Sequence, residues 1–135
     1  MLVAFPISGT FGTAFCDLAF WWTGDVFWPR AALWAAGAAF SLGVLAALAG
    51  MAETVLVPGV RRRAAAWSHA TVAMVLLSVL GATFALRLDD AAAAVLPWGA
   101  FLSALSLMLV ALTGWHGGKL VFEHQVGIKM PDEPR

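Results

Sequence analysis

The segment Ala64 to Leu86, AAAWSHATVAMVLLSVLGATFAL, decides the class of fold because it contains no lysine, arginine, aspartate or glutamate. A bilayer core about 30 Å thick needs about 20 consecutive apolar residues in a helix, so this segment is long enough to cross one. Charge bounds the segment on both sides, with Arg61 to Arg63 before it and Arg87 directly after it. We therefore predict a membrane-spanning helix over these residues.

Three more segments meet the same criterion. They run approximately from Leu2 to Thr23, from Ala31 to Val57 and from Ala91 to Phe122. The connections between them are short and rich in glycine, proline and charge, and short connections imply antiparallel neighbours. We predict an all-α fold, an integral membrane up-down bundle of four transmembrane helices over residues 1–128, followed by a short polar cytoplasmic tail over residues 129–135.

The composition agrees with a membrane protein and argues against nucleic acid as a partner. The 135 residues are 61% hydrophobic and only 12% charged, which is typical of a chain that spans a bilayer. Lysine plus arginine equals aspartate plus glutamate, at 8 each, so the chain has no strong field of either sign. The lipid bilayer is the first partner that the sequence predicts.

The distribution of charge predicts the orientation. In a bundle of four spans, both termini and the loop between the second and third spans lie on one side. That side holds Arg61, Arg62, Arg63, Lys119, Lys129 and Arg135, and the other side holds Arg30 and Arg87. By the positive-inside rule the side with more cations is cytoplasmic, so we predict that both termini are cytoplasmic.

An ionisable side chain at membrane depth costs at least about 2.5 kcal/mol on insertion scales, so each one needs a partner or a function. Asp17 lies about two turns before the outer end of the first span, on the same side as Arg30 and Arg87. We expect Asp17 to form a structural pair with one of these two arginines. A role in proton relay is the alternative.

Two histidines fall at nearly matched depth on neighbouring spans. His69 lies six residues after Arg63, about 9 Å into the third span, and His116 lies eight residues before His124, about 12 Å deep from the same side. A transmembrane haem b requires such a pair, with one imidazole from each of two helices. The sequence therefore predicts a haem site, or more generally a metal site, with ligands among His69, His116 and His124.

Neighbouring residues suit the same cofactor. Gly114, Gly117 and Gly118 would leave room for a flat macrocycle against the fourth span. Cations lie slightly closer to the cytoplasm than these histidines and could pair with the haem propionates. They are Lys119 and Arg62, together with the arginine on either side of Arg62.

Three other interpretations of the histidines remain open. His124 can turn its polar edge toward the membrane interface. His69 can form a structural hydrogen bond across helices to Glu53. Alternatively, His69 and His116 bind a smaller metal ion together with Glu53 or Glu123, although the spacing matches no recognised metal motif.

Several of these residues also match a known family. The stretches TGDVFWPRAALW (23–34), RRRAAAWSH (61–69) and TGWHGGKLVFEHQVGI (113–128), together with Asp17 and Arg87, resemble the bacterial membrane family catalogued as domain of unknown function 2231. The resemblance covers nearly the whole chain, and its most specific part is Gly-Gly-x-Leu-Val followed by a histidine. It implies a four-helix protein of the bacterial inner membrane. Related modules occur joined to Rieske-type iron–sulfur or other redox domains, which implies electron transfer.

The resemblance and the depth argument favour different histidine pairs. His69, His124 and Arg87 match family positions, whereas His116 stands where the family is commonly apolar and Glu53 stands where it usually has aspartate. The family also often carries a histidine at the position of Ala4, and this chain does not. The resemblance therefore implies His69 with His124, depth favours His69 with His116, and both pairs remain open.

These observations predict an inner-membrane subunit that binds haem b and transfers electrons between a redox partner protein and the quinone pool. Such a subunit would have no substrate chemistry of its own, and no catalytic residue is predicted. The alternative is a non-catalytic membrane anchor or assembly subunit of a larger complex, whose polar residues only lock the bundle. A transporter is disfavoured because the spans show neither an inverted repeat nor paired broken helices.

Overall fold

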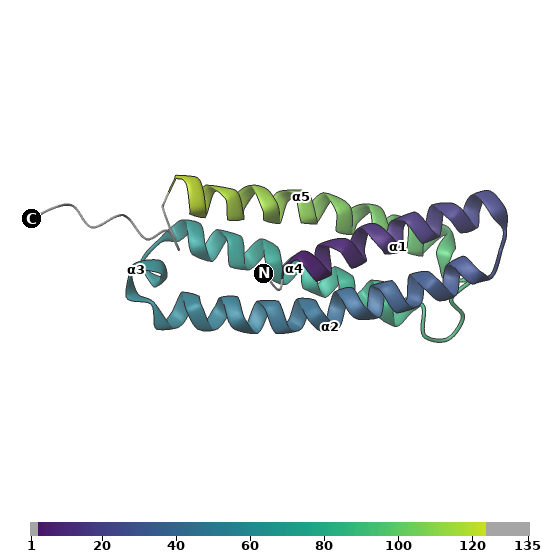
Figure 1. Cartoon of the computed structure of the whole chain (residues 1–135), viewed down its shortest axis with the longest axis horizontal. Coiled ribbons are helices and arrows are strands. Elements are labelled where there is room, and N and C mark those ends of the chain that lie inside the picture. Colours follow the sequence, from purple (N-terminus) through teal and green to yellow (C-terminus); the bar gives the residue numbers. More distant parts are fainter. Residues whose placement is uncertain (1–2, 124–135) are drawn as a thin grey trace, which may run out of the picture.

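Four long helices run side by side along the length of the molecule (Figure 1). The structure is a computed structural model that describes residues 3–123. Its elements in chain order are α1 (Ala4–Thr23), α2 (Phe27–Leu56), α3 (Pro58–Arg61), α4 (Ala64–Leu86), η1 (Val95–Gly99) and α5 (Ala100–Phe122). The prediction of an all-α fold is confirmed, and the predicted tail over residues 129–135 lies outside the described residues.

The four long helices close into a ring. Helix α1 packs against α2 and α5, and α4 packs against α2 and α5 in turn. The two ends of the bundle carry different charges. We call the end with α3 and Arg61 to Arg63 the arginine end, and the end with the loops at Asp25 and Asp89-Asp90 the aspartate end.

Three stretches of helix are long and apolar enough to cross a membrane, judged by length and composition among the described residues. They are α2, α4 and the unit of η1 with α5. Four such spans were predicted, and α1 does not meet the criterion because Ser8, Thr10, Thr13 and Asp17 make it more polar. The hydroxyls of Ser8, Thr10 and Thr13 donate to backbone carbonyls four residues earlier, so none of these three is left unpaired.

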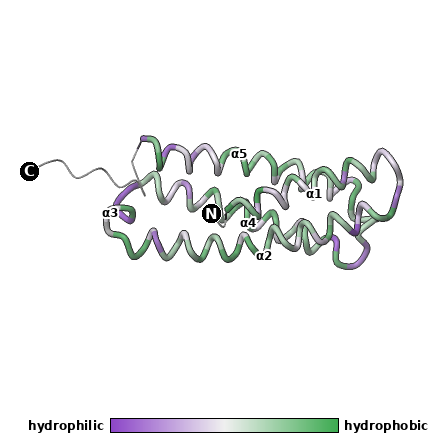
Figure 2. The backbone as a smooth tube through the Cα atoms, in the orientation of Figure 1, coloured by the Kyte–Doolittle hydropathy of each residue, from purple (hydrophilic) through white to green (hydrophobic). Residues whose placement is uncertain are grey.

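The bundle is apolar outside and packed with small residues inside. Large apolar side chains such as Phe15, Leu48 and Met74 are exposed, and the hydrophilic segments gather at the turns of both ends (Figure 2). Within α2, Ala32, Ala36 and Ala39 have no exposed surface. Small residues in the interior let helix backbones approach closely, as is usual for helices packed in lipid.

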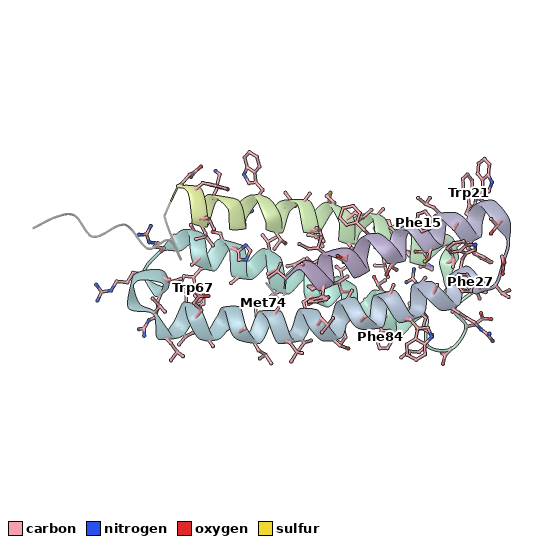
Figure 3. All side chains as sticks on the ribbon, viewed as in Figure 1. Phe15, Trp21, Phe27, Trp67, Met74 and Phe84 are labelled. Carbon is pink, nitrogen blue, oxygen red and sulfur yellow. The ribbon has the colours of Figure 1, made fainter. Side chains whose placement is uncertain are left out.

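Tryptophans occupy both ends of the bundle. Figure 3 shows Trp21 near the aspartate end and Trp67 near the arginine end, and the side chains of both residues are exposed. Aromatic rings of this kind favour the interface between lipid and water.

The predicted start of the fourth span is wrong. That span was expected to begin at Ala91, but the chain forms turns up to Ala94 and an irregular helical turn over η1, and the regular helix α5 begins at Ala100. Leu96 inside η1 has an extended backbone, with φ −119° and ψ 136°. Pro97 explains this, because the ring of a proline disfavours the helical conformation of the residue before it.

Candidate functional site

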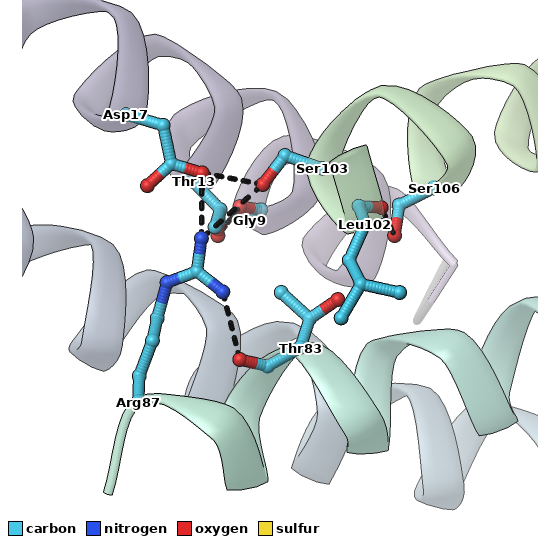
Figure 4. Close-up of polar contacts among 8 residues, drawn as sticks. All are labelled: Gly9, Thr13, Asp17, Thr83, Arg87, Leu102, Ser103 and Ser106. Carbon is cyan, nitrogen blue, oxygen red and sulfur yellow. Dashed lines mark hydrogen bonds and ion pairs between the residues drawn. The ribbon is translucent and has the colours of Figure 1, made fainter. Parts of the chain in front are cut away.

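The most deeply buried charges of the described chain form one cluster near the aspartate end (Figure 4). Arg87 is 0% exposed and Asp17 is 4% exposed. The Arg87 Nη2 atom donates to Asp17 Oδ2 at 2.6 Å, and this ion pair joins α1 to the end of α4. The expected pairing of Asp17 is therefore with Arg87 and not with Arg30, which is exposed.

Ser103 on α5 brings a third helix into the cluster. Its hydroxyl donates to Asp17 Oδ2 at 2.5 Å and accepts from Arg87 Nη2 at 3.3 Å. Arg87 is the residue that caps the C-terminus of α4, and its Nη1 atom donates back to the Thr83 carbonyl at 2.8 Å. A cation at this place is favourable, because the C-terminus of a helix carries partial negative charge.

The cluster is not fully satisfied. Asp17 Oδ1, Arg87 Nε and Thr83 Oγ1 are buried and have no hydrogen-bond partner among the described residues. Gly99 closes the cluster from the backbone side, since a Cβ atom there would lie 2.5 Å from the Ala94 carbonyl oxygen and 3.0 Å from Arg87 Nη2. The cluster therefore depends on a residue without a side chain at this position.

The sequence does not mark Ser103, Thr83 or Gly99 as site residues. The only signal for Ser103 is a hydroxyl inside an apolar span, and this signal is weak. Most hydroxyls of the long helices, such as that of Ser106, bond to their own helix, so a hydroxyl in a span does not identify a cross-helix contact.

The histidines lie toward the arginine end, where α4 meets α5. His69 is half-buried, and its ring packs against Gly117, with Cε1 3.2 Å from the position that a Cβ atom on Gly117 would take. His116 is the residue directly before Gly117, so His69 reaches α5 at the predicted level. The His116 Nδ1 atom lies 2.9 Å from the Leu112 carbonyl oxygen of its own helix.

The predicted clearance for a macrocycle is only partly present. The space beside Gly117 is filled by the ring of His69 itself. A Cβ atom on Gly114 or Gly118 would meet no atom within 4 Å. The Nδ1 atom of His69 is buried and has no hydrogen-bond partner among the described residues.

An apolar cavity of about 360 Å³ lies beside His69. Its walls come from α2 and α4, with contributions from the start of α1 and from Thr113 of α5. Thr54, His69 and Thr113 are the lining residues with polar side chains, and His116 is not part of the lining. The hydroxyls of the two threonines already donate to carbonyls of their own helices, which leaves His69 as the polar group of the cavity.

The other predicted site residues lie at the surface of the arginine end. Arg62 and Lys119 are exposed, and Lys119 Nζ lies 5.8 Å from the centre of the Trp115 ring. Glu53 is exposed and forms no hydrogen bond with His69. Between residues 3 and 123, histidine, cysteine and carboxylate side chains nowhere gather in a group of three that could hold a metal ion. His124 lies outside the described residues.

Comparisons with known proteins place the chain in a family. No curated protein and no solved structure matches this chain. One family model matches residues 1–130, and its description is "Predicted membrane protein (DUF2231)". This match covers nearly the whole chain and agrees with the long apolar helices. The chain is therefore a multi-pass membrane protein that belongs to the DUF2231 family.

Proposed function

We propose that this chain is an electron-transfer subunit of the membrane and that it holds haem b through His69. The observation that carries the proposal is the buried Nδ1 atom of His69, which has no hydrogen-bond partner among the described residues. His69 also lines the apolar cavity, so a ligand can approach it there. Haem iron in helical bundles takes imidazoles as axial ligands in such dry surroundings.

His116 would be the second residue to hold the haem. When Nδ1 of His116 donates to the Leu112 carbonyl, Nε2 is the nitrogen left free, which is how ligand histidines are commonly held. His69 contacts Gly117 next to it, so both imidazoles come from the same height of the bundle. A haem between them requires the His69 ring to turn away from Gly117.

The residues of the chain would provide the surroundings, and haem b would supply one-electron transfer at a potential set by its ligands and their environment. The walls of the cavity beside His69 are mostly apolar. Arg62 and Lys119 are exposed at the same end of the bundle, where they could pair with propionates.

We further propose that the arginine end faces the cytoplasm of a bacterium and that the chain lies in the inner membrane. In this arrangement the subunit passes electrons between a redox partner protein and the quinone pool. The excess of cations at the arginine end supports this orientation.

A pyridine haemochrome spectrum of the purified protein, together with its iron content, tests the proposal. We expect a haem b spectrum for the wild type and its loss in His69→Ala. Ser68→Ala is the matched control, because Ser68 is exposed and its hydroxyl only bonds the Ala64 carbonyl of its own helix. Loss of the spectrum in His116→Ala alone identifies His116 as the second ligand, and loss in His124→Ala alone identifies His124.

A wild-type protein without a Soret band and without iron would overturn the haem proposal. The second candidate function is then a membrane anchor or assembly subunit. The observation that favours it is the cluster of Asp17, Arg87 and Ser103, which ties three helices together and uses buried charge for structure.

A further inference from the structure

Helix α1 covers only part of the bundle. At 1.5 Å per residue, the 30 residues of α2 extend about 45 Å, whereas the 20 residues of α1 extend about 30 Å. Helix α1 begins partway along α2, so toward the arginine end the bundle consists of α2, α4 and α5 (Figure 1). The apolar cavity lies in this part of the bundle, and the start of α1 contributes only Val3 and Pro6 to its lining.

The cavity follows α2 and α4 over a similar length. Its lining extends along α2 from Gly43 to Thr54 and along α4 from His69 to Leu80, which corresponds to about 16 Å on each helix. A volume of about 360 Å³ over that length has room for one acyl chain.

The lining is tighter near Gly43 than near Gly50. A Cβ atom on Gly43 would lie 3.1 Å from the Leu77 side chain and 3.7 Å from Pro6. At Gly50, two turns closer to the arginine end, a Cβ atom would meet nothing within 4 Å. Gly50 lines the cavity and is exposed, so the cavity is open to the outside of the bundle at this level.

Three arginines lie beyond the cavity, on the side of the arginine end. Arg61 ends α3, Arg62 and Arg63 connect α3 to α4, and all three are exposed. Within residues 3–123 the only ion pair joins Arg87 to Asp17, so no described carboxylate neutralises these three arginines. The Trp67 Nε1 atom donates to the Arg61 carbonyl at 2.9 Å and ties this segment to the first turn of α4.

The charge at this end favours an anion. Glu53 and Glu123 are the described carboxylates nearby, and the three arginines with Lys119 outnumber them. Guanidinium groups bind phosphate through paired hydrogen bonds, and basic pockets between transmembrane helices bind the headgroups of anionic lipids.

We propose that the cavity is a binding site for one anionic phospholipid, with an acyl chain between α2 and α4 and its phosphate on Arg61, Arg62 and Arg63. Because α1 contributes only Val3 and Pro6 to the lining, the acyl chain can enter sideways from the bilayer. The lipid covers apolar walls of α2 and α4 that no other described element covers. This proposal does not depend on haem, and a protein without any haem spectrum can satisfy it.

Native mass spectrometry of the protein, purified in a mild detergent and exposed to vesicles of phosphatidylglycerol or phosphatidylcholine, tests the proposal. We expect one phosphatidylglycerol to stay bound to the wild type, and phosphatidylcholine to bind more weakly. Combining Arg61→Gln, Arg62→Gln and Arg63→Gln should weaken retention of phosphatidylglycerol on the order of a hundredfold, since each cation near the membrane surface contributes about 1 kcal/mol. Circular dichroism checks that this variant is folded.

Two further variants separate the acyl chain from the headgroup. Gly50→Leu places a side chain inside the cavity and should reduce retention of phosphatidylglycerol at least tenfold, while all three arginines remain. Gly114→Leu is the matched control, because a Cβ atom there also meets nothing within 4 Å and Gly114 does not line the cavity. Equal retention by these two variants would show that the chain does not lie in the cavity and would overturn the proposal.

Two more results would also overturn it. In the first, phosphatidylglycerol and phosphatidylcholine bind equally and the arginine substitutions do not alter their binding. In the second, the protein retains a quinone in place of a phospholipid. If the triple variant does not fold, Arg62→Gln alone and the salt dependence of wild-type binding take its place. Retention of phosphatidylglycerol should then fall with rising salt, because exposed charges are screened, and binding that does not change with salt counts against the arginines.

Discussion

At the scale of single residues, the Asp17–Arg87 pair is the feature that most needs a physical account. An arginine with no exposed surface inside a membrane bundle is costly unless its charge is matched. Asp17 supplies the countercharge, and Ser103 and the Thr83 carbonyl take further donor groups of the guanidinium. Breaking a buried pair costs more than the pair itself contributes, because the remaining charge loses its compensation.

Replacing Asp17 should therefore lower stability in a graded way. Asp17→Asn keeps an oxygen acceptor and should cost about 1–3 kcal/mol, and Asp17→Ala should cost about 3–5 kcal/mol because it leaves Arg87 without any partner on α1. Equilibrium unfolding in mixed micelles, followed by circular dichroism, measures both. Asp89→Asn is the control, since Asp89 is exposed and should change stability by less than about 0.5 kcal/mol. An Asp17→Asn protein that is as stable as the control but has lost an electron or proton flux would favour a relay.

The contact of Gly99 with the cluster gives a second prediction. Gly99→Ala puts a methyl group 2.5 Å from a carbonyl oxygen and 3.0 Å from Arg87 Nη2, so the backbone or the arginine must move. We expect a loss of about 1–3 kcal/mol, as for other overpacked interior positions. Gly114→Ala, in open space on α5, is the control in the same unfolding measurement. Equal stability of the two variants would mean that the cluster shifts without cost.

The sequence predicts part of this site for clear reasons. Opposite charges at equal depth in a membrane are stabilised by pairing, so the pairing of Asp17 with an arginine could be predicted without a structure. The choice of Arg87 over Arg30 could not be predicted, because it depends on how α4 ends against α1. Side-chain packing also could not be predicted. The glycines around His116 were expected to leave space for a macrocycle, whereas the ring of His69 occupies the space at Gly117.

At the scale of helices, the contact of α1 with α2 depends on a missing side chain. A Cβ atom on Gly9 would lie 2.8 Å from Ala39 Cβ and 3.0 Å from the Ala35 carbonyl oxygen. Ala39 is fully buried there. Such close approach is how helices gain dispersion contacts when no hydrophobic effect drives them together in lipid.

Gly9→Ala should therefore separate α1 from α2 and lower stability by about 1–3 kcal/mol. Gly12→Ala on the same helix is a matched control, because its Cβ atom would lie 3.8 Å from Ala35 Cβ, an ordinary contact distance. The two variants can be compared by their unfolding midpoints in mixed micelles. If Gly12→Ala is the more damaging change, the packing of α1 described above is wrong.

The limits of a helix can be predicted from sequence where charged residues or a proline in the first turn set them. They cannot be predicted where the backbone conformation of a single residue sets them. Helix α4 begins at Ala64 and ends at Leu86, as predicted, because arginines bound the apolar segment on both sides. The predicted second span began at Ala31, but α2 begins at Phe27, since Pro29 is tolerated in a first turn. Pro97 has the opposite effect on the residue before it, and hydropathy alone does not register that break.

At the scale of the whole molecule, the difference in exposed positive charge between the two ends is larger in the structure than the sequence alone indicates. Arg87 was one of two cations assigned to the aspartate end, and it is buried against Asp17. Arg30 is then the one exposed cation of that end within residues 3–123, next to Asp25, Asp89 and Asp90. The arginine end exposes Arg61 to Arg63 and Lys119. Unpaired lysines and arginines near span ends are what hold a loop in the cytoplasm.

We therefore predict that a reporter active only in the periplasm is silent when fused after Arg135 and active when inserted between Asp89 and Asp90. A reporter that fluoresces only in the cytoplasm should give the reverse pattern at the same two sites. Changing Arg61 to Arg63 to glutamine while adding three arginines beside Asp89 removes the asymmetry, so this variant should show mixed or inverted activity. Periplasmic activity after Arg135 in the wild type would refute the orientation. It would also move the arginines, and with them the phosphate of the proposed lipid, to the outer leaflet.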